Sequence, residues 1–253
     1  IREAGITSLE KGRTFYTSNS GLIPLRREIC NYLRRRFDLD YTIDEVMVTV
    51  GGSEGIDLAL RAMLDPGDEV LIPQPCYVSY LPCTILADGV PVTIPLQEKN
   101  EFKLTAEELE AAITPKTKVL IMPFPNNPTG SIMTKEDLEP IVEVVKKYDL
   151  FVISDEIYSE LSYDGEHVSI AAFEGMKERT ILINGFSKGF AMTGWRLGYV
   201  IAPKEIIENC KKVHDFLTVG AAAPLQRAAI VGLNFDDDYY AEVTKIYTKK
   251  KNL

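Results

Sequence analysis

Four short stretches of the chain carry side chains that could do chemistry. The glycines of Gly51–Gly55, ahead of an apolar helical pattern, let the backbone approach a ligand, and a helix start there suits a phosphate. Lys188 lies between aromatic residues and glycines, where its amine could be desolvated like that of a Schiff-base lysine. Asp155 follows a buried apolar run, where a carboxylate needs a partner cation. Asn127, in the rigid stretch Pro125–Gly130, could point an amide into a cleft.

Each of these features also has an ordinary structural interpretation. A Gly-Gly-Ser turn can simply join a strand to a helix, Asp155 can be a helix N-cap, and a lone lysine is usually a solvated surface group. The spacing of Gly51–Gly55 matches neither G-x-G-x-x-G nor G-x-x-x-x-G-K-[ST], so a dinucleotide site and a P-loop are both disfavoured.

Composition narrows the function classes. The 253 residues include 28 Lys and Arg against 37 Asp and Glu, a formal net charge of −9, which argues against nucleic acid as a partner. No run approaches the roughly 18 apolar residues of a membrane helix, so we expect no membrane partner. With only His167 and His214 in the chain, a three-His zinc site is impossible and no metal site is predicted. Both histidines are expected at the surface or in packing.

The cysteines bear on location. They are Cys30, Cys76, Cys83 and Cys210, and no two of them form a C-x-x-C pair. Cysteines in this arrangement are typical of reduced, buried thiols. The expected location is therefore cytoplasmic.

Apolar runs alternate with helical patterns from about residue 45, and this alternation predicts the fold class. The β-rich runs are Val46–Val50, Val70–Pro73, Val90–Ile94, Lys118–Met122, Leu150–Ser154, Thr180–Asn184 and Gly198–Ala202. Amphipathic segments long enough for crossover helices include Gly55–Leu64, Thr105–Ile113 and Lys135–Tyr148. The pattern predicts an α/β fold with a mostly parallel seven-stranded sheet flanked by helices. Because the link from Asn184 to Gly198 is short and rich in glycine, the last strand is expected to run antiparallel, at an edge or inserted.

Some helices carry further signals. Thr105 with Glu108 fits a capping box. A basic helix is expected around Pro24–Phe37, and its run Arg34–Arg36 is interpreted as a solvated face or a subunit contact. After Pro203 the pattern predicts helices only.

Ligands of an open parallel sheet bind beyond the carboxyl ends of its strands, where the side chains described above lie. Together these ends offer a phosphate cradle, an acid, an amide, a tyrosine, a lysine and an arginine. Pyridoxal 5'-phosphate needs such a set: an amine for its aldehyde, an acid for its pyridine nitrogen, donors for its phenolate oxygen and cations for its phosphate. We therefore predict this cofactor.

Four blocks of the sequence resemble a known family. Val50–Gly55, Asn126–Gly130, Ser154–Tyr158 and Ser187–Gly198 look like the blocks of the class I/II aminotransferases, which are pyridoxal-phosphate enzymes of fold type I and include aspartate aminotransferase. The blocks keep the family's order and approximate separations. The resemblance runs from about residue 16 to residue 203.

The resemblance implies roles for the residues around the cofactor ring, with Lys188, Asp155 and Tyr158 as the catalytic residues. Lys188 would form a Schiff base with the cofactor and shuttle the substrate proton. Asp155 would pair with the protonated ring nitrogen. Tyr158 and Asn127 would hydrogen-bond the phenolate oxygen, and Tyr77 would stack on the ring face.

The resemblance also implies how the phosphate is held. Ser53 and Glu54 would donate backbone N–H groups, while Ser187 and Arg196 would contribute their side chains. Tyr16 matches the tyrosine that the family sends across a dimer interface to a neighbour's phosphate. A homodimer with shared active sites is therefore expected.

By the same resemblance the chain divides into three parts. Residues 1–40 would be an N-terminal segment with the dimer-contact tyrosine, and residues 41–235 the large domain that binds pyridoxal phosphate. Residues 236–253 would begin the helix leading to a C-terminal small domain that is largely absent from this chain. The family's arginine for the substrate carboxylate would lie in that small domain.

The leading hypothesis is an aminotransferase that moves an amino group from an L-amino acid to a 2-oxo acid through the Schiff base on Lys188. Two alternatives stay open: a pyridoxal-phosphate-dependent C–S β-lyase on the same scaffold, and a non-catalytic, aminotransferase-like sensor domain of a transcriptional regulator. A nucleotide-binding dehydrogenase is the weakest hypothesis because the glycine spacing does not fit it.

Overall fold

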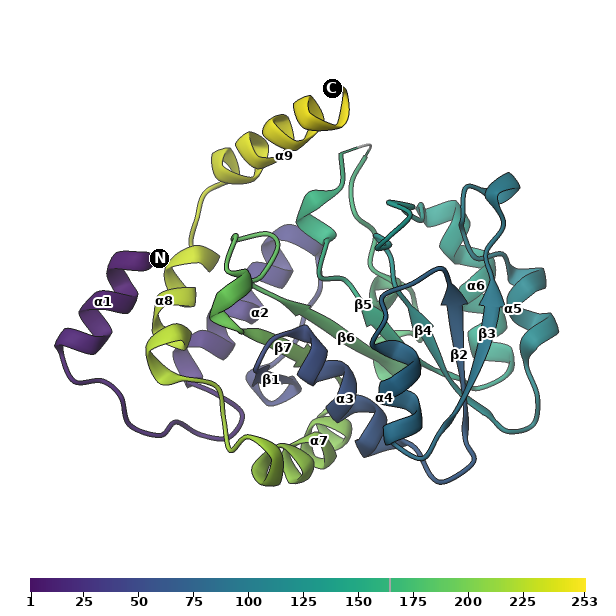
Figure 1. Cartoon of the computed structure of the whole chain (residues 1–253), viewed down its shortest axis with the longest axis horizontal. Coiled ribbons are helices and arrows are strands. Elements are labelled where there is room, and N and C mark those ends of the chain that lie inside the picture. The colour runs from purple at the N-terminus through teal and green to yellow at the C-terminus, as the bar shows by residue number, and fades with distance from the viewer. Residues whose placement is uncertain (164) are drawn as a thin grey trace.

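The computed structural model describes residues 1–163 and 165–253. Its strands lie side by side in one mixed sheet (Figure 1). The described residues contribute seven strands: β1 (Val46–Thr49), β2 (Glu69–Gln74), β3 (Val90–Pro95), β4 (Thr117–Met122), β5 (Phe151–Asp155), β6 (Thr180–Gly185) and β7 (Gly198–Ile201). Their order across the sheet is β1-β7-β6-β5-β4-β2-β3. Each predicted β-rich run corresponds to one of these strands.

One strand of the sheet runs against the others. β2, β3, β4, β5 and β6 pair in parallel, whereas β7 is antiparallel to both β6 and β1. The prediction of an antiparallel last strand is confirmed, and β7 is inserted between two neighbours. Because it runs in reverse, β7 begins at the edge where the parallel strands end.

The α-helices lie on both faces of the sheet and around its edge. They are α1 (Arg2–Glu10), α2 (Ile23–Phe37), α3 (Gly52–Met63), α4 (Tyr80–Leu86), α5 (Ala106–Ala112), α6 (Lys135–Lys147), α7 (Lys204–Leu217), α8 (Ala223–Leu233) and α9 (Asp237–Lys251). In the part of the chain that the structure describes, none of them has the length and apolar character to cross a membrane. The predicted capping box of α5 forms, since Glu108 N–H donates to Thr105 Oγ1 at 3.2 Å and Thr105 N–H donates to Glu108 Oε2 at 3.2 Å.

Alternating residues of the strands divide the core into layers. On β5, Ile153 packs with α3, α4 and α7 on one face, while Val152 packs with α5 and α6 on the other. On β1, Met47 faces α3 and α7, while Val46 and Val48 face α2 and α8. Side chains at alternating positions of a strand therefore pack into the hydrophobic cores on opposite faces of the sheet, and this packing on both faces holds the strand backbone rigidly.

Both histidines are packing residues. His214, on α7, is fully buried, and the His167 side chain is nearly so. His214 Nε2 lies 3.5 Å from Glu54 Oε2, and His167 Nε2 hydrogen-bonds with Glu156 Oε2 at 2.8 Å. The packing interpretation is confirmed, and the surface interpretation is wrong.

Candidate active site

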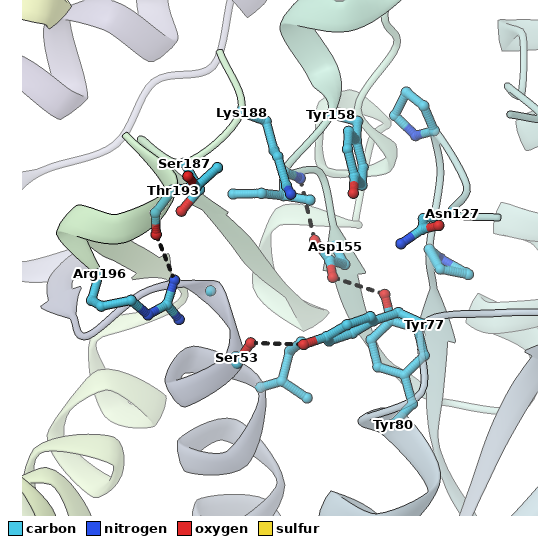
Figure 2. A pocket seen from close by; sticks show the side chains of 15 residues that line it. Ser53, Tyr77, Tyr80, Asn127, Asp155, Tyr158, Ser187, Lys188, Thr193 and Arg196 are labelled. Atoms are coloured by element: carbon cyan, nitrogen blue, oxygen red, sulfur yellow. Dashed lines mark hydrogen bonds between the residues drawn. The ribbon is translucent and has the colours of Figure 1, made fainter. Parts of the chain in front are cut away.

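A cleft of about 200 Å³ opens at the edge of the sheet where the parallel strands end (Figure 2). Its walls come from the segments that follow β1, β2, β4, β5 and β6 and from the segment that precedes β7. Eight of the ten predicted site residues line it: Ser53, Tyr77, Asn127, Asp155, Tyr158, Ser187, Lys188 and Arg196. The sheet therefore brings together side chains that lie up to 143 residues apart in the sequence.

Asp155 forms the floor of the cleft as the last residue of β5. It is 7% exposed, and in the described part of the chain its carboxylate accepts hydrogen bonds from the Tyr80 hydroxyl at 2.8 Å and from Ile157 N–H at 3.2 Å. Burial raises the pKa of Asp155, and these two donors offset only part of that effect. A cationic group in the cleft would stabilise the ionised carboxylate.

Tyr80 is a site residue that the sequence reasoning missed. It begins α4, three residues after Tyr77, and the two rings meet edge to face at 5.7 Å. Burial and the neighbouring carboxylate of Asp155 raise the pKa of Tyr80 well above its ordinary value, so its hydroxyl stays a donor. The spacing of two tyrosines by three residues at a helix start was the available signal.

Lys188 reaches into the cleft from the loop after β6. Its Nζ lies 5.4 Å from the centre of the Tyr158 ring, and Figure 2 shows its amine pointing toward Asp155. The loop is held closed by hydrogen bonds from Met192 N–H to Phe186 O and from Ala191 N–H to Lys188 O, both 3.2 Å. Lys188 is half-buried, as the sequence analysis predicted from its aromatic neighbours.

The other end of the cleft combines a guanidinium with the start of a helix. α3 begins at Gly52, and its N-cap residue Gly51 contributes no side chain, so the first N–H groups of the helix are open to a ligand. A Cβ on Gly51 would lie 2.6 Å from Arg196 Nη2, so glycine is what leaves room for this cation. Arg196 reaches this edge because β7 begins here, and its Nη1 donates to Thr193 O at 3.2 Å.

A second glycine allows this approach. A Cβ on Gly198 would lie 2.6 Å from the carbonyl carbon of Gly51 and 2.7 Å from the nitrogen of Gly52. The first residue of β7 thus packs directly against the turn before α3. Thr193, in the same loop, lines the cleft and was not predicted.

Tyr77 lies between the end of the cleft at Asp155 and the end at the start of α3. Its hydroxyl lies 3.2 Å from Ser53 Oγ, and hydrogen bonds with Ser53 and Ser79 lower its pKa. Asn127 lines the far wall in the loop after β4. Its neighbour Asn126 is buried and donates from Nδ2 to Pro75 O at 3.1 Å, which ties this loop to the one that carries Tyr77.

Two predicted residues do not line the cleft. The Glu54 carboxylate turns away to accept hydrogen bonds from Val50 N–H at 2.5 Å and from the Thr218 hydroxyl. Burial pushes the pKa of Glu54 upward, but the nearby His214 ring and the hydrogen bonds from Thr218 and Val50 outweigh this effect and lower it. The predicted role of Glu54 concerns its backbone N–H, which the side-chain direction does not test. Tyr16 is 93% exposed, and its contact with a second subunit stays a prediction.

The chemistry of this donor set fits pyridoxal phosphate. The space beside Gly51 holds a cation next to an open helix start, a combination that binds anions. Asp155 is a buried carboxylate with a raised pKa, which a protonated ring nitrogen would stabilise. The amine of Lys188 points into the space above it. An anion site, an acid and an amine thus surround one cleft.

The family model for aminotransferases of class I and II matches residues 1–252. The chain belongs to this family. The family resemblance of the four sequence blocks is thereby confirmed, and so is the predicted fold class, the fold type I of pyridoxal-phosphate enzymes. Members of this aminotransferase family use pyridoxal phosphate, in agreement with the donor set of the cleft.

Several aminotransferases are similar to this chain over its whole length. The putative aminotransferase YugH of Bacillus subtilis (strain 168) is 49% identical over 254 residues, which cover 100% of this chain and 66% of YugH. The aspartate aminotransferase of Pyrococcus abyssi (strain GE5 / Orsay) is 44% identical over 100% of this chain and 66% of its own length. The crystal structure of the aromatic aminotransferase from Pyrococcus horikoshii OT3 matches with a TM-score of 0.95 at 43% identity, covering 99% of this chain and 68% of that one. The chain spans about two thirds of the length of the curated relatives.

Proposed function

We propose that the protein is an aminotransferase that moves an amino group from an L-amino acid to a 2-oxo acid with pyridoxal 5'-phosphate as cofactor. The observation that carries this proposal is the convergence of the Lys188 amine and the buried Asp155 carboxylate in one cleft of a class I/II aminotransferase fold. When bound, pyridoxal phosphate would supply an electron sink that stabilises negative charge on the substrate Cα.

Proton transfer falls to Lys188. Its half-buried amine, close to the Tyr158 ring, is shielded from bulk water and can take the proton from the substrate Cα and return it. Asp155 would keep a proton on the ring nitrogen, because its ionised form, disfavoured by burial, would gain a cationic partner there. The Tyr80 hydroxyl fixes the direction of the carboxylate.

The remaining cleft residues, together with the backbone of Glu54, would orient the cofactor. Arg196, the Ser187 hydroxyl and the N–H groups of Ser53 and Glu54 would hold its phosphate. Tyr77 would cover one ring face, and Asn127 and Tyr158 would donate to the phenolic oxygen. Ser53 and Glu54 share the start of α3, while the other groups come from five further segments at the ends of strands, so the sheet sets their mutual distances.

The division of the chain follows from this assignment. Residues 41–235 contain all the residues that line the cleft and form the proposed cofactor-binding domain. Residues 1–40 are proposed to contribute the subunit contact, and residues 236–253 to lead to a domain that binds the substrate carboxylate. We place the protein in the cytoplasm, which is supported by free thiols at Cys30, Cys76, Cys83 and Cys210.

A homodimer is the proposed assembly. Tyr16 and Phe15 are 93% and 80% exposed, and Phe216, at the end of α7, is 92% exposed. The two segments lie together, since Asn19 Nδ2 donates to the Asp215 carboxylate. An aromatic surface of this kind favours a second copy of the chain as its partner.

The test of the proposed function is spectroscopic. Full-length protein with added pyridoxal phosphate should show a visible absorption band of the lysine-bound cofactor, and an L-amino acid should bleach it. Lys188→Ala should abolish the band and lower amino transfer by about 10³-fold or more, because both the bond to the cofactor and the proton carrier are removed.

The controls separate the alternatives. Lys146→Ala removes an exposed lysine of α6 and should leave the band unchanged. A band that persists in the Lys188→Ala protein would refute the role of Lys188. Pyruvate and ammonia formed from a cysteine conjugate without any 2-oxo acid would indicate a C–S lyase instead, and cofactor binding without turnover would indicate a sensor.

A further inference from the structure

The first turn of α9 holds the loop that carries Lys188. The Tyr239 hydroxyl donates to Gly189 O at 2.8 Å, one residue after the lysine. The Tyr239 ring stacks on Phe190 with 6.2 Å between the ring centres and 6° between the planes. One side chain of α9 thus makes both a polar and an aromatic contact with this loop, although the helix lies far from it in the sequence (Figure 1).

A second residue, Glu160, also contacts the loop that carries Lys188, and its carboxylate is buried. Glu160 belongs to the short 3-10 helix Ser159–Leu161, directly after Tyr158, and its side chain is only 7% exposed. A Cβ on Gly189 would lie 3.4 Å from Glu160 Cβ, so the Gly189 backbone packs closely on the Glu160 side chain. The segments carrying Lys188 and Tyr158 therefore share one support.

Glu160 is itself held in place. It accepts hydrogen bonds from the Tyr32 hydroxyl at 2.6 Å and from Arg36 at 3.1 Å through Nε and at 3.0 Å through Nη2. A carboxylate bound by both arms of a guanidinium has little rotational freedom. The interpretation of Arg34–Arg36 as a solvated face is wrong for Arg36, whose side chain is 25% exposed and paired with Glu160, and a subunit contact stays a prediction.

Arg36 also reaches α9. Its Nη1 lies 3.1 Å from Asp237 Oδ1, and its guanidinium carbon lies 4.2 Å from the centre of the Tyr240 ring. Arg36 therefore links α2, the segment after Tyr158 and the start of α9. None of these contacts touches the cleft itself, since neither Arg36, Glu160 nor Tyr239 lines it.

We propose that Tyr239 and Glu160 are positioning residues for Lys188, acting through the Gly189 carbonyl and backbone. The proposal rests on the proposed function, because it concerns the amine that holds the cofactor. Glycine at 189 allows the loop to pack on Glu160, and the Tyr239 hydrogen bond holds the conformer in which the amine lies beside the Tyr158 ring. Any change in the position of α9 is then transmitted to the lysine.

The variant Tyr239→Phe tests this, because it removes the hydroxyl and keeps the ring stack. Tyr247→Phe is the matched control: Tyr247 lies on the same helix, stacks on Tyr163 at 6.0 Å, and its hydroxyl has no hydrogen bond within residues 1–163 and 165–253. We expect Tyr239→Phe to speed amide hydrogen exchange of residues 186–192 in the cofactor-free full-length protein by about fivefold. It should also raise the Kd for pyridoxal phosphate about fivefold and shift the pH midpoint of the visible band.

A purely structural role of Tyr239 would lower the unfolding temperature without moving the midpoint of the band. Unchanged loop exchange, or faster exchange with an unchanged midpoint and Kd, would overturn the proposal. Glu160→Gln, which keeps the shape and removes the charge that Arg36 needs, should act in the same direction as Tyr239→Phe. Failure of the proposed function is distinguishable, because it shows in the parent protein, either as a missing visible band or as no transfer of an amino group to a 2-oxo acid, whereas loop exchange is measured without cofactor.

Discussion

The carboxylates of two adjacent residues, Asp155 and Glu156, lie on opposite sides of the backbone and have different hydrogen-bond partners. Both are buried, at 7% and 2% exposed. Asp155 faces the cleft and has two donors in the described structure. Glu156 faces the other side, where Ser154 Oγ donates to its Oε1 at 2.9 Å, Ser169 Oγ donates at 2.6 Å, and His167 hydrogen-bonds its Oε2 at 2.8 Å.

The difference shows that burial alone does not mark a reactive carboxylate. Glu156 has its hydrogen-bonding capacity taken up by the protein, so it serves as an anchor between β5 and the segment that contains His167 and Ser169. Asp155 has only two donors in the described structure, and they do not offset the burial that raises its pKa. A group that the protein leaves short of partners is available to a ligand.

The largest expected effect comes from Asp155→Asn. This substitution keeps the shape but removes the charge that would face the ring nitrogen, so kcat/KM for amino transfer should fall by about 10² to 10³-fold. Steady-state kinetics on the full-length protein measure it, with circular dichroism as the control for folding. If the activity of Asp155→Asn stayed within about threefold of the parent, Asp155 would not be the carboxylate that binds the cofactor.

The converse variant is Glu156→Gln. It leaves Ser154, Ser169 or His167 with a poorer partner inside the core, so the free energy of unfolding should fall by about 2 kcal/mol, while kcat/KM changes much less than in Asp155→Asn. Urea unfolding measures the loss. Glu143→Gln, an exposed position paired with Lys146, is the control and should change stability by less than about 0.5 kcal/mol. A Glu156 variant as stable as this control would contradict the anchoring role.

The smallest expected effect concerns how the free energy of unfolding changes with pH, for which Asp155 and Glu54 contribute with opposite signs. Because the pKa of Asp155 is raised in the folded protein, its ionisation destabilises the cofactor-free fold as the pH rises above 3.8, its ordinary value. Because the pKa of Glu54 is lowered, its ionisation stabilises the fold above 4.5, and this stability is lost as the pH falls through the lowered value.

Unfolding measured from about pH 3 to 7 checks these signs. With rising pH, Asp155→Asn should become more stable relative to the parent, and Glu54→Gln less stable, by about 1 kcal/mol. Parallel curves for the two variants would show that the two carboxylates do not differ as the structure indicates. Work on the cofactor-free protein is essential, since a bound cation would reverse the sign for Asp155.

Much of the site was predictable because the carboxyl ends of parallel strands meet at one edge. Lys188, Asp155 and Asn127 each follow an apolar run, and this position brought them to the cleft. Tyr80 and Thr193 were missed because neither directly follows a strand. The role of Arg36 was also missed, because its partner Glu160 lies 124 residues away and no local pattern reports such a pairing.

The sequence by itself determined the α/β fold, the reversal of the last strand and the residue types that pyridoxal phosphate requires. These follow from local causes: hydrophobic period, helix caps and the length of a link. Only the tertiary structure decided which of the two neighbouring acids would face the ligand. Strand geometry sends Asp155 and Glu156 to opposite sides, but Ser169, His167 and Tyr80 reach them from distant segments. Ser169 and His167 bind Glu156 on the side away from the cleft, while Tyr80 orients Asp155 and leaves it facing the cleft.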